Sequence, residues 1–249
     1  MVAAPSPEAS RIARPWVAAA LACIAAVAIA AGALQATLPT VGSAPARVAA
    51  ILRLHGARPV AVGPRERVAR AVVATEDERF YRHGAVDFIS LGRVALHALV
   101  GWGPDPGGAT IAQQLAKLLY GGRGGVWGDL RAVGLAFKLD HRFAKREILA
   151  LYLNANYYGH GFYGVEQASR GYFGRPPDAL SWAQASLLAG LPQAPTAYDP
   201  FRHPAAARVR RGEVVRQLVA NRILTAAQAR AVAAAPLGLR PAAGAASAT

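Results

Sequence analysis

The chain has 249 residues, enough for one or two domains, and 53% of them are hydrophobic, which excludes a disordered or collagen-like protein. The single cysteine, Cys23, excludes an intrachain disulfide and a cysteine-ligated zinc or iron–sulfur site. The formal net charge of +14 attracts phosphates of any kind, whether in nucleic acid, in lipid head groups or in a pyrophosphate substrate.

An apolar segment near the N-terminus predicts a membrane-spanning helix. No charged residue occurs between Pro15 and Ala46, and residues 16–34 form an uninterrupted apolar run. At a rise of about 1.5 Å per residue, this run nearly matches a hydrocarbon core of roughly 30 Å. We therefore expect a transmembrane anchor over residues 16–38, after a cytoplasmic segment of residues 1–15. A cleaved signal peptide is the alternative, although its apolar stretch usually has about 7–15 residues.

The charges around this segment predict its orientation. Arg11 and Arg14 precede the span, and the positive-inside rule places such residues in the cytoplasm. Only these two arginines and Glu8 are charged before residue 47, so nearly all of the net charge follows the span. On the outer side of a membrane we expect no nucleic-acid partner, and the charge suits anionic lipid phosphates better.

The rest of the chain predicts a mainly α-helical fold. Apolar residues recur at helical spacing, and no run of alternating strand pattern occurs. Thr110 can cap a helix that carries Ile111, Leu115 and Leu118 on one face. The tail, residues 241–249, is rich in alanine, glycine and serine, which predicts disorder. The expected helices cover residues 65–80, 87–100, 111–119, 126–143, 145–155, 164–173, 178–191, 204–221 and 225–235.

A dense acidic cluster is the first candidate for chemistry. Three consecutive acids, Glu76, Asp77 and Glu78, precede Phe80 and His83. A carboxylate held against aromatic rings is disfavoured in its charged form and can serve as a general acid or base near neutral pH. On a continuous helix, Glu76 and Phe80 would share one face, four residues apart. A capped, charged helix end explains the same composition, so both interpretations stay open.

A glutamine pair is the second candidate. Gln113 and Gln114 lie in the middle of an otherwise apolar helix, and their amides suit sugar hydroxyls or the orientation of an acid. Lys117, one turn further on, is a point charge suited to phosphate. A solvated helix edge is the alternative, and it fits one glutamine better than an adjacent pair.

Five blocks in order resemble glycosyltransferase family 51, the peptidoglycan transglycosylases, especially their monofunctional, membrane-anchored type. The resemblance runs from about residue 47 to residue 239, and five ordered blocks are more specific than any single motif. The first is Glu76-Asp77-x-x-Phe80-x-x-His83, and the second runs from Gly107-Gly108 through Gln113-Gln114 to Lys117. The remaining blocks are residues 143–154, 158–174 and 187–200.

This resemblance implies a lysozyme-like helical glycosyltransferase domain over residues 47–240, behind a single transmembrane helix. It also implies a bacterial inner-membrane protein whose catalytic domain is periplasmic. Glu76 corresponds to the catalytic base of the family. The substrate-binding residues that the resemblance implies are Asp77, Phe80, His83, Thr110, Gln113, Gln114, Lys117, Arg123, Lys145, Asn154 and Arg210.

The implied reaction polymerises lipid II into glycan strands, as cell-wall biogenesis and cell shape require. A lipid-linked nascent glycan is the donor, and lipid II supplies the acceptor hydroxyl whose proton Glu76 takes. Undecaprenyl pyrophosphate leaves with inversion at the anomeric carbon. Lys117, Arg123 and Arg210, with or without a divalent cation such as Mg²⁺, would stabilise the leaving phosphates. Other cell-wall synthesis proteins are expected partners.

One position departs from the family pattern. An ungapped count back from Lys145 aligns the family's R-K-x-x-E with residues 128–132, so Ala132 stands where the second catalytic glutamate is expected. Asp129, one helical turn earlier, is the candidate second acid. Two alternatives follow: a lysozyme-like lytic glycan cleaver, which can use one acid, and a non-catalytic relative that binds lipid II without turnover. Lys117 and the basic charge speak against the cleaver.

Overall fold

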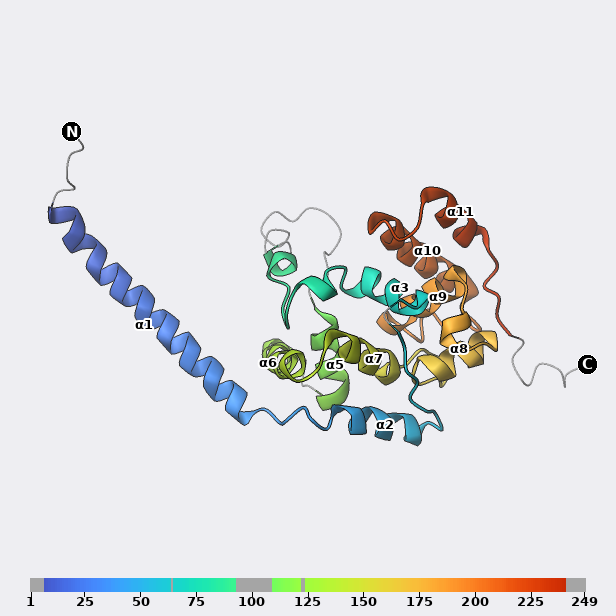
Figure 1. Cartoon of the computed structure of the whole chain (residues 1–249), viewed down its shortest axis with the longest axis horizontal. Helices are drawn as coiled ribbons and strands as arrows, with labels where there is room; N and C mark the ends of the chain where they lie inside the picture. The colour runs from blue at the N-terminus through green and yellow to red at the C-terminus, as the bar shows by residue number, and fades with distance from the viewer. Residues whose placement is uncertain (1–6, 64, 93–108, 122–123, 241–249) are drawn as a thin grey trace, which may run out of the picture. The chain divides into compact units, whose positions relative to one another are not determined.

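The computed structural model describes residues 7–63, 65–92, 109–121 and 124–240, with side chains from residue 16 on (Figure 1). It divides the chain into two units, residues 1–39 and 40–249. The first unit contains helix α1, Pro7–Thr37. Residues 16–37 of α1 are long and apolar enough to cross a membrane, and this stretch is not buried within the structure. The expected N-terminal apolar helix is confirmed, whereas its insertion into a membrane stays a prediction because a signal sequence near the N-terminus can pass the same test of length and composition.

The second unit is built from helices, as the pattern of apolar residues predicts. Its described residues contain no strand, and an isolated antiparallel bridge joins Tyr157 to Tyr163. The expected mainly α fold is therefore confirmed. The elements are α2 (Ala44–Leu54), α3 (Arg67–Glu76), η1 (Phe80–Arg82), α5 (Ile111–Tyr120), α6 (Val126–Arg142), α7 (Lys145–Ala155), α8 (Val165–Phe173), η2 (Pro177–Ala179), α9 (Trp182–Gly190), η3 (Leu191–Gln193), α10 (Pro204–Ala220) and α11 (Ala226–Ala234), where η denotes a short 3₁₀ helix.

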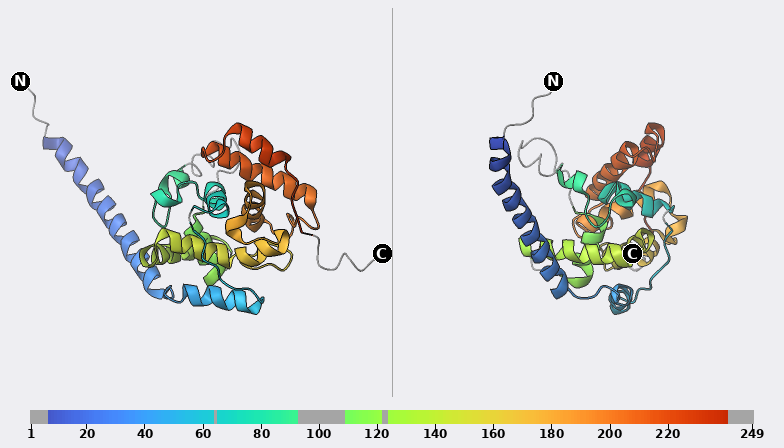
Figure 2. Two further views of the ribbon diagram at one scale, coloured as in Figure 1. Left: turned by 45° about the vertical axis from the view of Figure 1, so that its right-hand side comes forward. Right: turned by 60° about the vertical axis from the view of Figure 1, so that its left-hand side comes forward.

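Two groups of helices form the core of this unit (Figure 2). In one group, α9 packs against α3 and α10, and its Leu187 and Leu188 are fully buried. In the other, α5 packs against α6 and α7, and Leu115 of α5 is fully buried. Removal of this apolar surface from water is the main force that holds each group together. The first group supplies α3 and α10 to the candidate site, and the second supplies α5 and α7.

The helix around the acidic cluster is shorter than the sequence predicts. Helix α3 ends at Glu76, and Phe80 belongs to the separate helix η1. Asp77 leaves the helical conformation, with φ −162° and ψ 72°, because its carboxylate is bonded to groups outside α3. The prediction that Glu76 and Phe80 share one helical face is therefore wrong.

Other boundaries differ for local reasons. Helix α9 begins at Trp182 rather than at residue 178, because Ser181 and Gln184 form a capping box and residues 177–179 form η2. Helix α2 was not among the expected helices. Leu118 is 41% exposed, so it does not share the buried face of Ile111 and Leu115. Arg123, the tail and most of the expected helix at 87–100 lie outside the described residues.

Candidate active site

Glu76 is the centre of a partly buried cluster drawn from four helices. Its side chain is 16% exposed and stands at the last residue of α3. The Nε2 amide group of Gln114, on α5, donates a hydrogen bond to Oε2 of Glu76 at 3.0 Å. The hydroxyl of Tyr152, on α7, donates to Oε1 of Gln114 at 2.8 Å. The phenol thus fixes which end of the amide faces the carboxylate.

Arg210 of α10 completes the cluster. Its Nη2 lies 3.9 Å from Oε1 of Glu76, which is ion-pair distance but too long for a hydrogen bond. The guanidinium is held in place elsewhere, because Nε donates to the carbonyl of Gly190 at 3.0 Å and Nη1 donates to Glu213 at 2.8 Å. Arg210 is therefore a buried, fixed positive charge beside a carboxylate oxygen that keeps room for another partner.

The electrostatics of the cluster keep Tyr152 in its donor form. Burial, and after it the negative charge of Glu76, raises the pKa of Tyr152 well above its ordinary value. A phenol that stays protonated always presents a hydrogen to Gln114. The chain Tyr152–Gln114–Glu76 therefore has a single hydrogen-bond direction, which ends on the carboxylate.

Asp77 and His83 form a second buried group next to Glu76. Asp77 Oδ1 lies 2.6 Å from Nε2 of His83, and Oδ2 accepts a hydrogen bond from the backbone N–H of Ile111 at 3.0 Å. Burial raises the pKa of Asp77 more than these two hydrogen bonds lower it. Because Ile111 is the first residue of α5, Asp77 joins the end of α3 to the start of α5. The group fixes the backbone around Glu76.

Two further predicted residues tie the same segment down. Lys145 Nζ lies 2.7 Å from Asp140, donates to the carbonyl of Gly84 at 3.0 Å, and stands 4.9 Å from the ring centre of the fully buried Phe80. The Thr110 hydroxyl donates to the carbonyl of Ala85 at 2.8 Å. These contacts hold residues 80–85 against α5 and α7, so the contacts that Lys145 and Thr110 make in the structure are structural.

The two glutamines of the pair have different roles in the structure. Gln114 orients the acid, as one of the two interpretations of the pair predicts. Gln113 instead completes the capping box of α5, since its Oε1 accepts a hydrogen bond from the N–H of Thr110 at 3.2 Å. Asn154 is also used structurally, because its amide bonds to both the N–H and the carbonyl of Val60. The predicted roles of Gln113 and Asn154 in substrate binding stay predictions.

Lys117 and Asp129 form a separate, exposed ion pair. Their charged atoms are 2.7 Å apart, and the side chains are 47% and 65% exposed. Lys117 lies one turn beyond Gln114 on α5, whereas Asp129 belongs to the first turn of α6. Ala132, on the next turn of α6, is buried. Asp129 therefore neutralises the lysine expected to meet phosphate, and its role as second acid stays a prediction.

Sequence reasoning missed two members of the Glu76 cluster. Tyr152 lies between leucines in an apolar helix, so its pattern predicts only core packing. Glu213 lies three residues after Arg210, which is a common spacing for ion pairs on a helix, so the sequence does not single it out as a site residue. Their roles arise from tertiary contacts that bring α7 and α10 to α3.

The described residues do not fit a divalent cation held by the protein. No group of three or more His, Cys, Asp or Glu side chains that could hold a metal ion occurs among them. The carboxylate of Asp129 is paired with Lys117, and that of Glu76 is bonded to Gln114. Asp129 is thus already neutralised, and one of the two oxygens of Glu76 is already hydrogen-bonded.

Comparison with known proteins places this site in a family. The transglycosylase family model matches residues 62–219. The chain is 37% identical over 177 residues to penicillin-binding protein 2D of Bacillus subtilis (strain 168), which covers 70% of this chain and 25% of that protein. It is 40% identical over 164 residues to penicillin-binding protein 1A of Aquifex aeolicus (strain VF5), which covers 66% of this chain and 23% of that protein.

A solved structure of penicillin-binding protein 1A from Haemophilus influenzae is 30% identical, with a TM-score of 0.37, and the match covers 39% of this chain and 14% of that chain. The chain spans about a quarter of the length of the curated relatives named above. The family match covers more than half of the chain and includes Glu76, Gln114 and Arg210. This protein therefore belongs to the transglycosylase family.

Proposed function

We propose that this protein is a peptidoglycan glycosyltransferase, which polymerises lipid II into glycan strands and releases undecaprenyl pyrophosphate. The observation that carries the proposal is the carboxylate of Glu76, oriented by Gln114 and faced by Arg210 within the transglycosylase match. Penicillin-binding proteins are the relatives that share this segment, which supports peptidoglycan as the product.

Glu76 acts as the general base on the acceptor hydroxyl of lipid II. Gln114 occupies Oε2 with a hydrogen bond, so Oε1 is the oxygen that takes the proton. Arg210 places a positive charge beside Oε1 without a hydrogen bond to it, because its Nη2 stands 3.9 Å away. As the proton moves to Glu76, the acceptor oxygen attacks the anomeric carbon of the lipid-linked glycan and the bond to the pyrophosphate breaks with inversion.

The departing pyrophosphate gains negative charge, which nearby cations stabilise. Lys117 is the exposed cation on the same helix as Gln114, and Arg210 is the buried one; Arg123, outside the described residues, is the third candidate. The phosphates displace Asp129 as the partner of Lys117. We assign no step to Mg²⁺, because the described residues contain no group of three or more side chains that could hold a metal ion, and the divalent cation stays a prediction.

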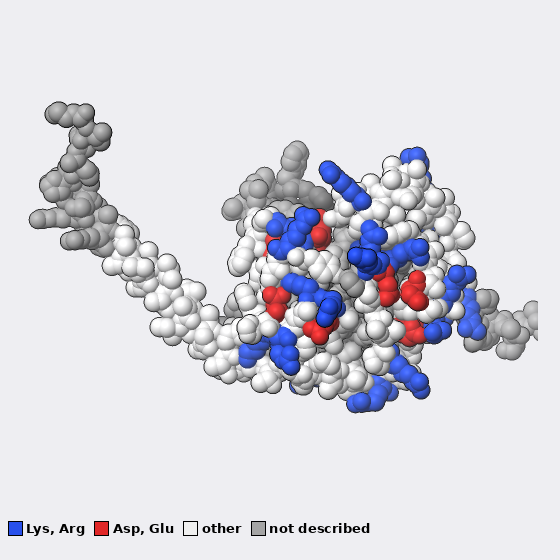
Figure 3. Space-filling model, in the orientation of Figure 1, with Lys and Arg blue, Asp and Glu red and all other residues white. Residues whose placement is uncertain are grey.

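Membrane anchoring by α1 fits this reaction, because both substrates carry polyprenyl chains. The described side chains of α1 are uncharged, whereas lysines and arginines are spread over the visible face of the second unit (Figure 3). With Arg11 and Arg14 on the cytoplasmic side, the second unit is periplasmic, where it meets lipid II and other cell-wall synthesis proteins. An alkaline phosphatase fusion at Gly63 tests this: activity is expected in the periplasm, and activity only of a cytoplasmic reporter contradicts it.

A second candidate is a non-catalytic relative that binds lipid II. The observation in its favour is the buried Ala132, with the exposed Asp129 as its nearest acid along α6. In that case the chain holds the substrate but does not complete the departure of the pyrophosphate.

One experiment separates these functions. The purified full chain in detergent is incubated with lipid II and, separately, with finished peptidoglycan sacculi. We expect glycan strands and undecaprenyl pyrophosphate from lipid II, no digestion of sacculi, and no polymerisation by Glu76→Gln. Digestion of sacculi would instead identify a lytic cleaver. Lipid II binding without product, restored to turnover by Ala132→Glu, would support the non-catalytic relative. Absence of lipid II binding would contradict both lipid II proposals.

A further inference from the structure

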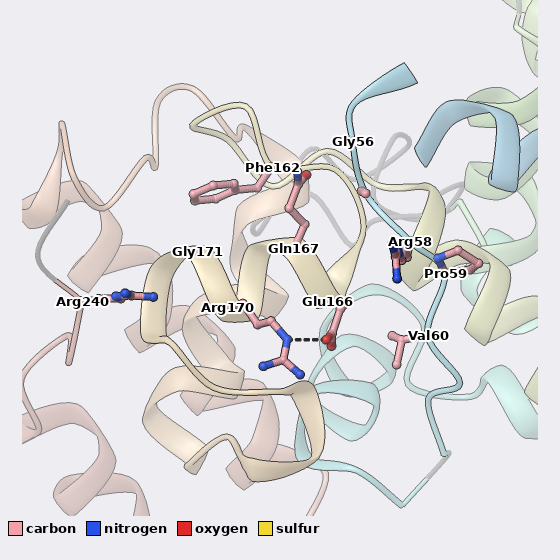
Figure 4. A pocket seen from close by; sticks show the side chains of 11 residues that line it. Gly56, Arg58, Pro59, Val60, Phe162, Glu166, Gln167, Arg170, Gly171 and Arg240 are labelled. Carbon is pink, nitrogen blue, oxygen red and sulfur yellow. Dashed lines mark hydrogen bonds and ion pairs between the residues drawn. The ribbon is translucent and has the colours of Figure 1, made fainter. Parts of the chain in front are cut away.

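A groove separate from the Glu76 cluster runs along α8 (Figure 4). We call it the α8 groove: it is lined by residues 56–60, Phe162, the face of α8 that carries residues 166, 167, 170 and 171, and Arg240. Its volume is about 630 Å³, within the range of small-molecule sites. Five of its eleven lining residues are exposed, among them Arg58, Arg170 and Arg240, so the groove opens at the surface and a branch of a long ligand can enter it.

The α8 groove carries surplus positive charge. Arg58, Arg170 and Arg240 line it, and Glu166 is the one carboxylate among the lining residues, all of which the structure describes. Glu166 is already paired with Arg170. Within the described chain, no carboxylate lies at ion-pair distance from Arg58 or Arg240. Two guanidinium groups therefore remain for an incoming anion, and guanidinium binds carboxylate or phosphate through two parallel hydrogen bonds.

Both unpaired arginines project from anchored backbone. Two residues after Arg58, the N–H and the carbonyl of Val60 are bonded to the buried side chain of Asn154 at 3.0 Å and 2.9 Å. Arg240 donates its own backbone N–H to the carbonyl of Tyr172 at 2.7 Å, and Leu237 just before it is buried. The backbone that carries Arg58 and Arg240 is thus fixed before a ligand arrives, which lowers the entropic cost of binding.

The groove also offers apolar contact beside its arginines, and its carboxylate, Glu166, is paired with Arg170. The ring of Phe162 lies over Gly171, and a Cβ added at that glycine would stand 2.3 Å from the ring. Gln167 has both ends of its amide bonded within the protein, to the N–H of Tyr163 and to the carbonyl of His55. A ligand with apolar carbons between separated anionic groups matches this combination of ring and arginines.

We propose that the α8 groove binds an oxyanion-bearing ligand, namely the carboxylates of the acidic peptide attached to the wall glycan. This rests on the proposed function, because that substrate carries such a peptide beside its reacting sugars. Arg58 and Arg240 each bind a carboxylate of the peptide, and the ring of Phe162 contacts the carbons between those carboxylates. The groove then holds a peptide branch of the glycan while Glu76 acts on the sugar.

The test measures binding by the full chain in detergent with calorimetry at low salt. The probes are the soluble peptidoglycan disaccharide with its peptide, the same disaccharide without the peptide, and inorganic phosphate. We expect binding of the peptide-bearing disaccharide, weakened about tenfold or more by the double variant Arg58→Gln/Arg240→Gln. The matched control, Arg216→Gln/Arg230→Gln, removes the same charge from exposed positions on α10 and α11 and should keep the affinity.

Three outcomes would overturn the inference. Wild-type chain that polymerises lipid II but does not bind the peptide-bearing disaccharide contradicts the groove assignment and leaves the proposed function standing. Equal losses in the two double variants would show that overall charge, not the groove, governs binding. Arginine-dependent binding of phosphate but not of the peptide-bearing probe would contradict the peptide as the source of the oxyanion.

Discussion

Helix α5 contributes to two charged regions that differ in construction. Around Gln114, the Glu76 cluster joins side chains of α3, α5, α7 and α10, most of them buried or nearly so. One turn further on, Lys117 meets only Asp129, and both side chains are largely exposed. Electrostatic catalysis needs groups that are oriented before the reaction, and water screens exposed pairs. In the proposed reaction, the base side is therefore preorganised, whereas the leaving-group side takes its final arrangement from the substrate.

The largest effect is expected at the base itself. Glu76→Gln keeps the shape and the bond to Gln114 but removes basicity, so polymerisation of lipid II should fall by about 10²–10⁴-fold. Lipid II binding should persist. Glu78→Gln, a neighbouring exposed acid, is the matched control and should stay near wild type. A comparable loss from Glu78→Gln, with Glu76→Gln unaffected, would show that the base is the other acid.

A smaller loss of activity is expected when Gln114, the residue that orients the carboxylate, is replaced. Gln114→Leu removes the hydrogen bond to Glu76 and leaves the Tyr152 hydroxyl unpaired, so kcat should fall by roughly 10–100-fold, the worth of a charge-assisted hydrogen bond. KM should change little, because Gln114 acts through Glu76. Steady-state polymerisation kinetics check this. A rise in KM with kcat unchanged would indicate that Gln114 contacts the substrate instead.

The same contrast explains what the sequence could and could not predict. Most helix positions, the Thr110 cap and the choice of Glu76 and Gln114 as candidate residues follow from local patterns, together with a resemblance carried by ordered blocks. The end of α3 at Glu76 does not, because Asp77 is drawn out of the helix by Ile111, 34 residues away. The roles of Tyr152 and Glu213 likewise depend on contacts between helices distant in sequence, and the local periodicity of apolar residues does not predict such contacts.

At the exposed pair the expected effect is smaller. Asp129→Asn removes the partner of Lys117, and an exposed ion pair is worth at most about 1 kcal/mol, or roughly fivefold. Because the phosphates replace Asp129 as the partner of Lys117 in the proposed reaction, polymerisation should change by no more than about fivefold, with an unchanged melting temperature. Asp178→Asn, another exposed acid, serves as the control. A loss as large as that of Glu76→Gln would show that Asp129 acts as the second acid in its own right.

The smallest effect concerns stability and pH. The pKa of Asp77 in the folded chain is raised above its ordinary value of 3.8, so the folded state holds this proton more tightly than the unfolded state. Its contribution to the free energy of unfolding is therefore lost as pH rises from about 3.8 through the raised pKa. Asp77→Asn should remove this decline, because asparagine does not titrate. Denaturant unfolding at several pH values measures it, and an identical pH profile for both proteins would contradict the assignment.

The most direct test of a preorganised base is a double-mutant cycle between Glu76 and Gln114. Polymerisation of lipid II is measured for wild type, Glu76→Gln, Gln114→Leu and the double variant. If Gln114 works by orienting Glu76, the double variant should be no slower than Glu76→Gln alone, because nothing basic remains to orient. Losses that multiply in the double variant would contradict the account, since the two residues would then act independently.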